Sequence, residues 1–144
     1  MPVQAEKEPD GAAALTQADY ETLAAFRFEL RRFLRFSEEA AKQLGMTPLQ
    51  HQALLAIRAA ATQTMSVGEL AEQLLVQPHS ASELADRLVA LGLLARETAD
   101  DDRRRVCLKL TPAALDRLAR MSATHRGEVV RIRPTLTDIL ERLG

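Results

Sequence analysis

The sequence predicts a mainly α-helical fold with one small β-hairpin. Apolar residues recur at helical spacing through several segments of the chain. Aromatic residues make up only 3% of a chain that is 47% hydrophobic, so leucine and alanine would form most of the core, as is typical of helical proteins. Two strand-like segments, 93–97 and 106–110, flank a charged stretch. Two short helices joined by a tight turn and followed by such a hairpin are the outline of a winged helix-turn-helix.

Length and composition set broad limits. A chain of 144 residues predicts one domain with a proper core. The single cysteine excludes an internal disulfide and is typical of a reducing compartment. No apolar run approaches the roughly 20 residues that span a bilayer, and the first residues lack the basic start and apolar core of a signal peptide. We therefore expect a soluble, cytoplasmic protein with no membrane partner.

The charge distribution bears on nucleic-acid binding. The net charge of −1 argues against it, but residues 1–21 carry −4, which leaves +3 on the remainder. Because this surplus is modest, binding to DNA would depend on individually placed arginines more than on a broad basic face.

Residues 1–15 lack periodicity and are predicted to form a disordered tail. Thr16, with Asp19 three residues later, predicts the start of a helix that ends at Leu44 before Gly45. This helix contains every aromatic residue of the chain, and it is apolar over so much of its circumference that it needs partners on more than one side. A second subunit and the chain's own winged region would supply them; the alternative is the central helix of a monomeric bundle. The apolar positions are Tyr20, Leu23, Phe26, Leu30, Phe33, Leu34, Ala40, Ala41 and Leu44.

The same helix carries a row of arginines. Arg27, Arg31 and Arg35 lie four residues apart. Such a row is most often a solvated face, paired with carboxylates such as Glu38 or Glu39. The alternative is that Arg27 and Arg31 border a pocket for an anionic effector.

The second helix is predicted to begin after the capping residue Thr47, with Pro48 at its first position, and to reach about Ala61. Gln50 completes a capping box. A lone half-buried histidine such as His51 is usually structural. Alternatively, His51 lines an effector cleft and confers some sensitivity to pH.

The helix-turn-helix follows. Ser66 and Glu69 predict a capping box for its first helix, and Gln77 with Pro78 predicts the start of the second, which ends before Gly92. The apolar sides are predicted to include Leu70, Ala71, Leu74 and Leu75 in the first helix and Ala81, Leu84, Ala85, Leu88 and Leu91 in the second. The opposite face of the second helix carries His79, Ser80, Ser82, Glu83, Asp86 and Arg87. Such hydroxyl and imidazole groups suit hydrogen bonding in a DNA groove.

The charged stretch 98–105 is predicted to be the loop of the hairpin. Arginines at a hairpin tip suit the narrow, electronegative minor groove of A·T tracts. The adjacent aspartates would pair with an arginine and hold it rigid. Beyond the hairpin, Thr111 and Pro112 predict a helix to about Arg131, with a short final helix from Pro134. The buried positions predicted for these helices include Leu115, Leu118, Met121, Val129, Leu136, Ile139, Leu140 and Leu143.

Several strings resemble the MarR family of bacterial transcription regulators. They are Gly92-Leu93-Leu94 with Arg96, Asp102 with Arg104, Val106-x-Leu108-x-Leu110-Thr111, the segment His79–Leu88, and Met46-Thr47-Pro48-Leu49-Gln50. Ala114 departs from the family's usual glycine, which concerns only the start of a helix. The resemblance implies one MarR-like domain over 16–144, with dimerisation helices at 16–44 and 112–144 and a DNA-binding winged region at 47–111. It further implies a homodimeric repressor of a roughly palindromic operator in double-stranded DNA, released by a small anionic or aromatic effector.

These expectations assign roles to individual residues. His79, Ser80, Ser82 and Glu83 would face the major groove, and Arg87 would contact a phosphate or else pair with Glu83. Arg104, oriented by Asp102, would reach the minor groove with Arg103 and Arg105. Ser66 and Gln77 would offer helix N-terminal groups to phosphates.

No catalytic constellation is present in the sequence. His51, His79 and His125 lie far apart in the chain, none at metal-ligand spacing with another histidine or with Cys107. We therefore expect no enzymatic activity, no cofactor and no metal, and we expect Cys107 to be an ordinary strand residue. The alternative function is a winged-helix protein-interaction module without DNA binding.

Overall fold

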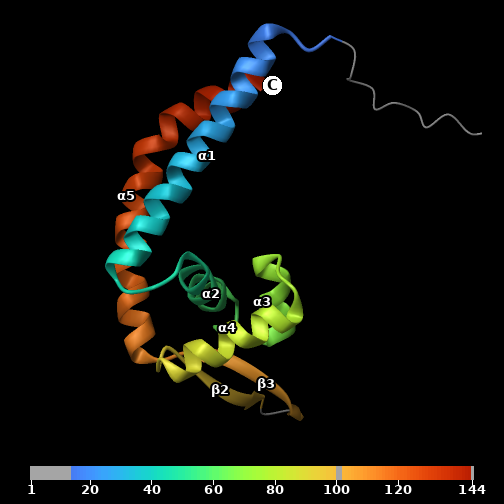
Figure 1. Ribbon diagram of the computed structural model, residues 1–144, viewed down its shortest axis with the longest axis vertical. Helices are drawn as coiled ribbons and strands as arrows, with labels where there is room; N and C mark the ends of the chain where they lie inside the picture. Colours follow the sequence, from blue (N-terminus) through green and yellow to red (C-terminus); the bar gives the residue numbers. More distant parts are fainter. Residues whose placement is uncertain (1–13, 100–101, 144) are drawn as a thin grey trace, which may run out of the picture. The chain divides into compact units, whose positions relative to one another are not determined.

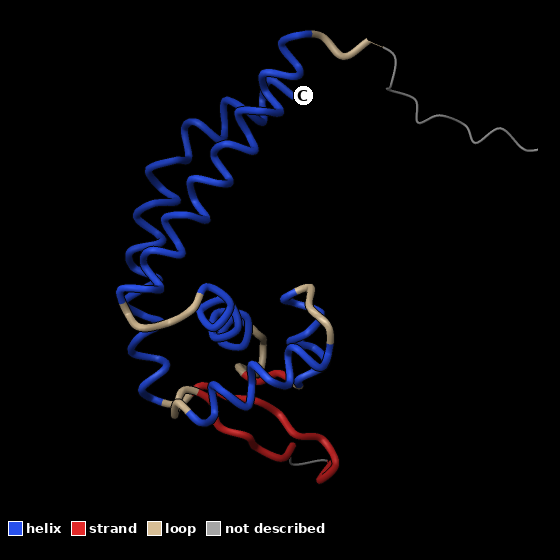
Figure 2. Tube along the Cα trace, viewed as in Figure 1, coloured by secondary structure: helices blue, strands red, loops and turns tan. Residues whose placement is uncertain are grey.

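The computed structural model describes residues 14–99 and 102–143. The described chain is mainly helical, with a small three-stranded antiparallel sheet (Figures 1 and 2). It divides into two compact units, one within Met1–Arg35 and Glu128–Gly144 and the other Phe36–Gly127. Helices α1 (Gln17–Gln43) and α5 (Pro112–Leu143) contribute residues to both units. The fold class predicted from the sequence is confirmed.

The helix starts follow the predicted caps. At α1, the Asp19 N–H donates to Thr16 Oγ1 at 3.2 Å and the Thr16 N–H donates to Asp19 Oδ2 at 2.8 Å. At α2 (Pro48–Ala59), the Gln50 N–H donates to Thr47 Oγ1 at 3.2 Å, and the Thr47 N–H donates to Gln50 Oε1 at 3.1 Å. Gly45, after α1, has a φ of +72° and is the predicted stop.

The helix-turn-helix consists of α3 (Val67–Leu74) and α4 (Pro78–Ala90). Two leucines predicted on its apolar side are exposed instead. Leu75 is 92% exposed because it is the left-handed cap of α3, with a φ of +55°, and so lies outside the helical face. Leu91 is 56% exposed because α4 ends one residue earlier. Gly92, with a φ of +73°, ends the segment as predicted.

The sheet contains β1 (Thr64–Met65), β2 (Leu94–Ala99) and β3 (Asp102–Leu110), in the order β1-β3-β2. The strand β1 was not predicted from the sequence, because two residues are too few to show a periodic pattern. The prediction of a loop over 98–105 is largely wrong, since β2 and β3 extend into this stretch. The register jumps from the pair Thr98–Val106 to the pair Ala99–Asp102, so three successive residues of β3 have no partner on β2.

The helix α5 runs without a break through Pro134, whereas two helices were predicted there. Proline removes one backbone hydrogen bond from a helix, but its fixed φ is compatible with helical backbone. Leu118 and Met121 are buried as predicted, whereas Leu115 and Val129 are exposed.

The core of the unit Phe36–Gly127 gathers side chains from α2, α3, α4, α5 and the sheet. The largest fully buried ones are Leu54, Ile57, Leu70, Leu88, Leu93, Leu108 and Met121. The buried positions of α4, Ala81, Ala85 and Leu88, all lie on one side of that helix, so its polar side is left to solvent.

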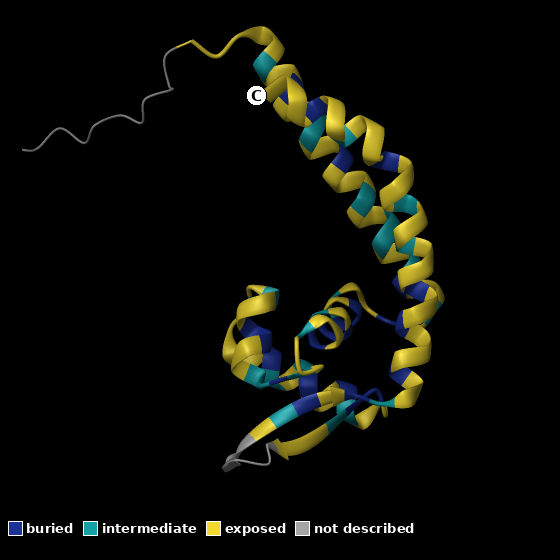
Figure 3. Cartoon of the chain, turned by 180° about the vertical axis from the view of Figure 1, so that it is seen from behind, coloured by how far each residue is buried: buried dark blue, intermediate teal, exposed yellow. Residues whose placement is uncertain are grey.

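In the other unit, the first part of α1 and the last part of α5 are largely exposed (yellow in Figure 3), and many of their exposed residues are large and apolar. They are Tyr20, Leu23, Phe28, Leu30 and Leu34 of α1 and Val129, Val130, Leu140 and Leu143 of α5. Of the helices described, none has the length and apolarity that crossing a membrane requires.

Candidate nucleic-acid interface

The exposed face of α4 carries the residues predicted to read DNA. His79, Ser80, Glu83 and Arg87 are exposed and Ser82 is half-buried. His79 Nε2 lies 3.1 Å from Glu83 Oε1, one helical turn away. Glu83 therefore pairs with His79, an ion pair only when the imidazole is protonated. The alternative prediction, that Glu83 pairs with Arg87, is not what the structure shows.

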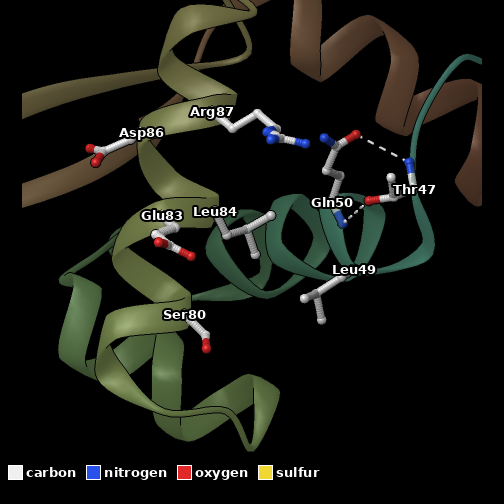
Figure 4. Close-up of a pocket in the computed structure, with 8 residues that line it drawn as sticks. All are labelled: Thr47, Leu49, Gln50, Ser80, Glu83, Leu84, Asp86 and Arg87. Carbon is white, nitrogen blue, oxygen red and sulfur yellow. Dashed lines mark hydrogen bonds between the residues drawn. The ribbon is translucent and has the colours of Figure 1, made fainter.

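Within residues 14–99 and 102–143, Arg87 makes no ion pair. Its side chain extends from α4 toward Gln50 of α2, across a groove of about 680 Å³ (Figure 4). The groove is lined by Thr47, Leu49, Gln50, Ser80, Glu83, Leu84, Asp86 and Arg87. An unpaired guanidinium at the open edge of a helix is well suited to bind a phosphate.

The structure adds a contact that could not be predicted from the sequence. The Arg96 guanidinium of β2 donates to the Asp86 carboxylate of α4 in an ion pair. The two residues are ten positions apart and belong to different elements, so no spacing rule could have paired them. This pair links the exposed side of α4 to the hairpin β2–β3, and it engages a carboxylate that would otherwise repel phosphates.

The two predicted helix N-terminal groups differ. The Ser66 hydroxyl accepts from the Glu69 N–H at 3.1 Å and donates to Glu69 Oε1 at 3.0 Å, so it already has partners. Gln77 at the start of α4 makes no side-chain cap, which leaves the first N–H groups of α4 available to an anion. The start of α4 therefore suits a phosphate better than the start of α3.

The hairpin residues can be described only in part. Asp102, Arg103, Arg104 and Arg105 belong to the backbone of β3. Nothing is described of their side chains. The prediction that Asp102 orients Arg104 therefore lies outside the described residues.

His51 and His125, far apart in the sequence, meet in the unit Phe36–Gly127. Their ring centroids are 4.8 Å apart, with a tilt of 33° between the ring planes. His51 is only 4% exposed, rather than half-buried as predicted. Burial, and then the charge of His125, hold the pKa of His51 below its ordinary value.

The other predicted effector residues, Arg27 and Arg31, are exposed on α1 in the first unit. Their neighbour Arg32 pairs with Glu29 at 3.4 Å, rather than with Glu38 or Glu39. No cluster of three or more histidine, cysteine or acidic side chains that could hold a metal occurs among the described residues. Cys107 is a half-buried free thiol on β3.

A helix-turn-helix followed by a β-hairpin, with a polar face on its second helix, defines the chain as a winged-helix protein. Residues 44–105 match the MarR family. The helix-turn-helix and most of the hairpin thus lie in a segment that matches the MarR family, and the described chain shares the fold of the solved structures below. No curated protein matches it significantly in sequence.

Solved structures share the fold. AbsC, a MarR family transcriptional regulator from Streptomyces coelicolor, superposes with a TM-score of 0.72 at 21% identity, over 89% of this chain and 88% of that one. Wild-type MarR from E. coli gives 0.67 at 23% identity, over 83% and 94%. A mutant of MepR from S. aureus, bound to an oligodeoxyribonucleotide, gives 0.66 at 20% identity, over 91% and 100%.

Proposed function

We propose that the protein is a homodimeric, DNA-binding transcription regulator that represses a roughly palindromic operator and is released by a small effector. The observation that carries this proposal is the exposed polar face of α4. It combines Arg87, which has no ion-pair partner among the described residues, with a helix N-terminus that lacks a side-chain cap and an ion pair to the neighbouring hairpin.

In the proposed complex, α4 lies in the major groove. Ser80, Ser82 and the His79–Glu83 pair meet base edges, and Arg87 binds a phosphate beside the groove. The hairpin β2–β3 lies along the adjacent minor groove with Arg103, Arg104 and Arg105. The Asp86–Arg96 pair keeps the two reading elements in a fixed relation, so both grooves are engaged together.

The proposed dimer uses the exposed apolar side chains of α1 and α5. The first unit also contains an apolar hollow of about 140 Å³, lined by Glu29, Leu30, Phe33, Val129, Ile132 and Leu136. Many large apolar side chains exposed on the same two helices are characteristic of a protein–protein interface. A two-fold axis would place two α4 helices about one DNA turn apart, which is why the operator is expected to be palindromic.

Release requires an effector that binds one conformation of the dimer better than the other. Arg27 and Arg31 on α1 remain candidates for an anionic or aromatic effector, as does His51 on α2. An effector that favours a spacing of the two α4 helices unsuited to DNA would dissociate the complex.

The test is binding of a fluorescent duplex from upstream of the protein's own gene, measured by anisotropy at several salt concentrations. Arg87→Ala is expected to weaken binding and to reduce the slope of log K against log salt by about 1, because one phosphate contact is lost. Arg104→Ala tests the hairpin in the same way. The matched control is Arg120→Ala, which removes one positive charge from an exposed pair with Asp116 in the first half of α5.

Equal losses in all three variants would show that only net charge matters, which contradicts the assigned interface. If the duplex binds no better than a random one, genome-wide recovery of bound fragments decides between a distant operator and a protein-interaction module. An absence of enriched fragments would overturn the DNA-binding proposal.

A further inference from the structure

The buried His51 and the half-buried His125 join three helices of the unit Phe36–Gly127. His51 comes from α2 and His125 from α5, and α1 contributes Ser37 and Phe36. The edge of the Phe36 ring meets the His125 ring, with centroids 5.7 Å apart and planes at 72°. The imidazoles therefore occupy the place where α2 packs against α1 and α5.

The hydrogen bonds fix the neutral form of His125. Its Nδ1 lies 2.7 Å from the Met121 carbonyl oxygen, which can only accept, so Nδ1 carries the proton. Its Nε2 then accepts from the Ser37 hydroxyl at 2.8 Å. The Nδ1 atom of His51 is buried and has no hydrogen-bond partner among the described residues. A proton on His51 would thus add a charge without a bond to stabilise it.

Within the described part of the chain, no opposite charge offsets such a proton on His51. Of the charged residues closest in sequence to the two histidines, Lys42, Arg58 and Arg126 are exposed to solvent, and Glu128 pairs with Arg131. Among the described residues, His125 is the one titratable group whose charge shifts the pKa of His51. It lowers that pKa, because a charge on His125 disfavours a second charge on His51. Two imidazolium rings with centroids 4.8 Å apart would repel each other in a site shielded from water.

We infer that the His51–His125 pair is a pH-sensitive joint that holds α2 against α1 and α5 when neutral and releases it in mildly acidic conditions. Helix α2 packs on α3 and on β1 and β3, so its displacement disturbs the support of α4 and of the hairpin. This inference deepens the proposed function, on which its effect on DNA binding rests. The direction follows from the lowered pKa of His51. Stability is complete above the ordinary histidine value of 6.5 and is lost as the pH falls toward the lower pKa of the folded state.

The joint is tested first without DNA. In an NMR titration of the intact protein between about pH 8 and pH 5, the His51 ring is expected to titrate below the ordinary histidine pKa of 6.5. Thermal unfolding across the same range should show a fall in Tm for the wild type, a smaller fall for His51→Phe and an unchanged fall for the control His79→Gln. A His51 ring that titrates at or above pH 6.5 would overturn the inference, and this measurement holds even if His51→Phe does not fold.

DNA binding supplies the second readout, with the same duplex at about pH 7.5 and pH 5.5 and constant ionic strength. The wild type is expected to bind several-fold more weakly at the lower pH, and His51→Phe is expected to lose most of this difference. Because His79 also lies on the proposed interface, the effect of the joint is the part of this difference that His51→Phe removes. Absent binding at both pH values refutes the proposed function, whereas binding that is independent of pH refutes the joint.

Discussion

Leu34 offers a direct test of the proposed dimer. Its side chain is 52% exposed on α1, together with Tyr20, Leu23 and Leu30. In the proposed dimer a second protomer covers this side of the helix. Leu34→Ala removes apolar surface without removing a hydrogen bond, and alanine is at least as good a helix former as leucine. The single protomer should therefore keep its fold while the dimer weakens.

The expected magnitude follows from the exposed area. Complete burial of a leucine side chain is worth about 1.5–3 kcal/mol, and about half of the Leu34 side chain remains to be covered. The partner's contribution is then about 1 kcal/mol per protomer. A two-fold axis places the substitution in the interface twice, so the dimer should lose about 2 kcal/mol, or about 30-fold in Kd.

Sedimentation equilibrium over a range of protein concentrations measures this change. The matched control is Leu75→Ala, because Leu75 is even more exposed but lies in the turn after α3, in the other unit. Its Kd should equal that of the wild type. An unchanged Kd for Leu34→Ala would refute the assignment of this side of α1 to the interface, and a wild type that remains monomeric throughout would refute the dimer itself.

Three further predictions concern stability. Thr47→Ala removes the cap of α2 and should cost about 1 kcal/mol, seen as a fall in Tm of about 2–4 °C; an unchanged Tm would contradict the role of the capping box. Leu54→Ala creates a cavity in the core and should cost about 2–5 kcal/mol by chemical denaturation, whereas the exposed neighbour in Leu55→Ala should change stability little. Glu128, which accepts from Arg131 Nε at 3.0 Å, has its pKa held below the ordinary 4.5 chiefly by that hydrogen bond. Stability should therefore fall as the pH drops below about 4.5, and Glu128→Gln should reduce this loss; an identical acid profile for the variant would contradict it.

The local signals in the sequence predicted the helix starts well. Thr16, Thr47 and Ser66 all act as N-caps, and Pro78 opens α4 after Gln77. These signals are reliable because a cap bonds backbone groups only two or three residues away. The polar face of α4 was predictable for a similar reason, since helical spacing alone separates it from Ala81, Ala85 and Leu88.

Features that depend on the tertiary structure were not predictable. The strand β1 exists because Thr64 and Met65 pair with β3, more than 40 residues later in the chain. The Asp86–Arg96 pair and the meeting of His51 with His125 likewise join elements that sequence distance separates. In α5, Pro134 is a local signal for a break, but the rest of the helix continues through it. Local rules fail where contacts distant in sequence decide the outcome.

The brevity of β1 has a consequence for solubility. It pairs with β3 only at Leu108 and Lys109, so within the described sheet the same edge of β3 from Asp102 to Cys107 has no neighbouring strand. An open strand edge invites a strand from another molecule and so promotes aggregation. Here the unpaired edge begins with one aspartate and three successive arginines, and its register with β2 is irregular. If two copies paired along this edge, their arginines would lie close together and repel each other. The irregular register of β3 would also disfavour regular pairing between the two strands. The arginines proposed to attract DNA would thus also keep the hairpins of separate molecules apart.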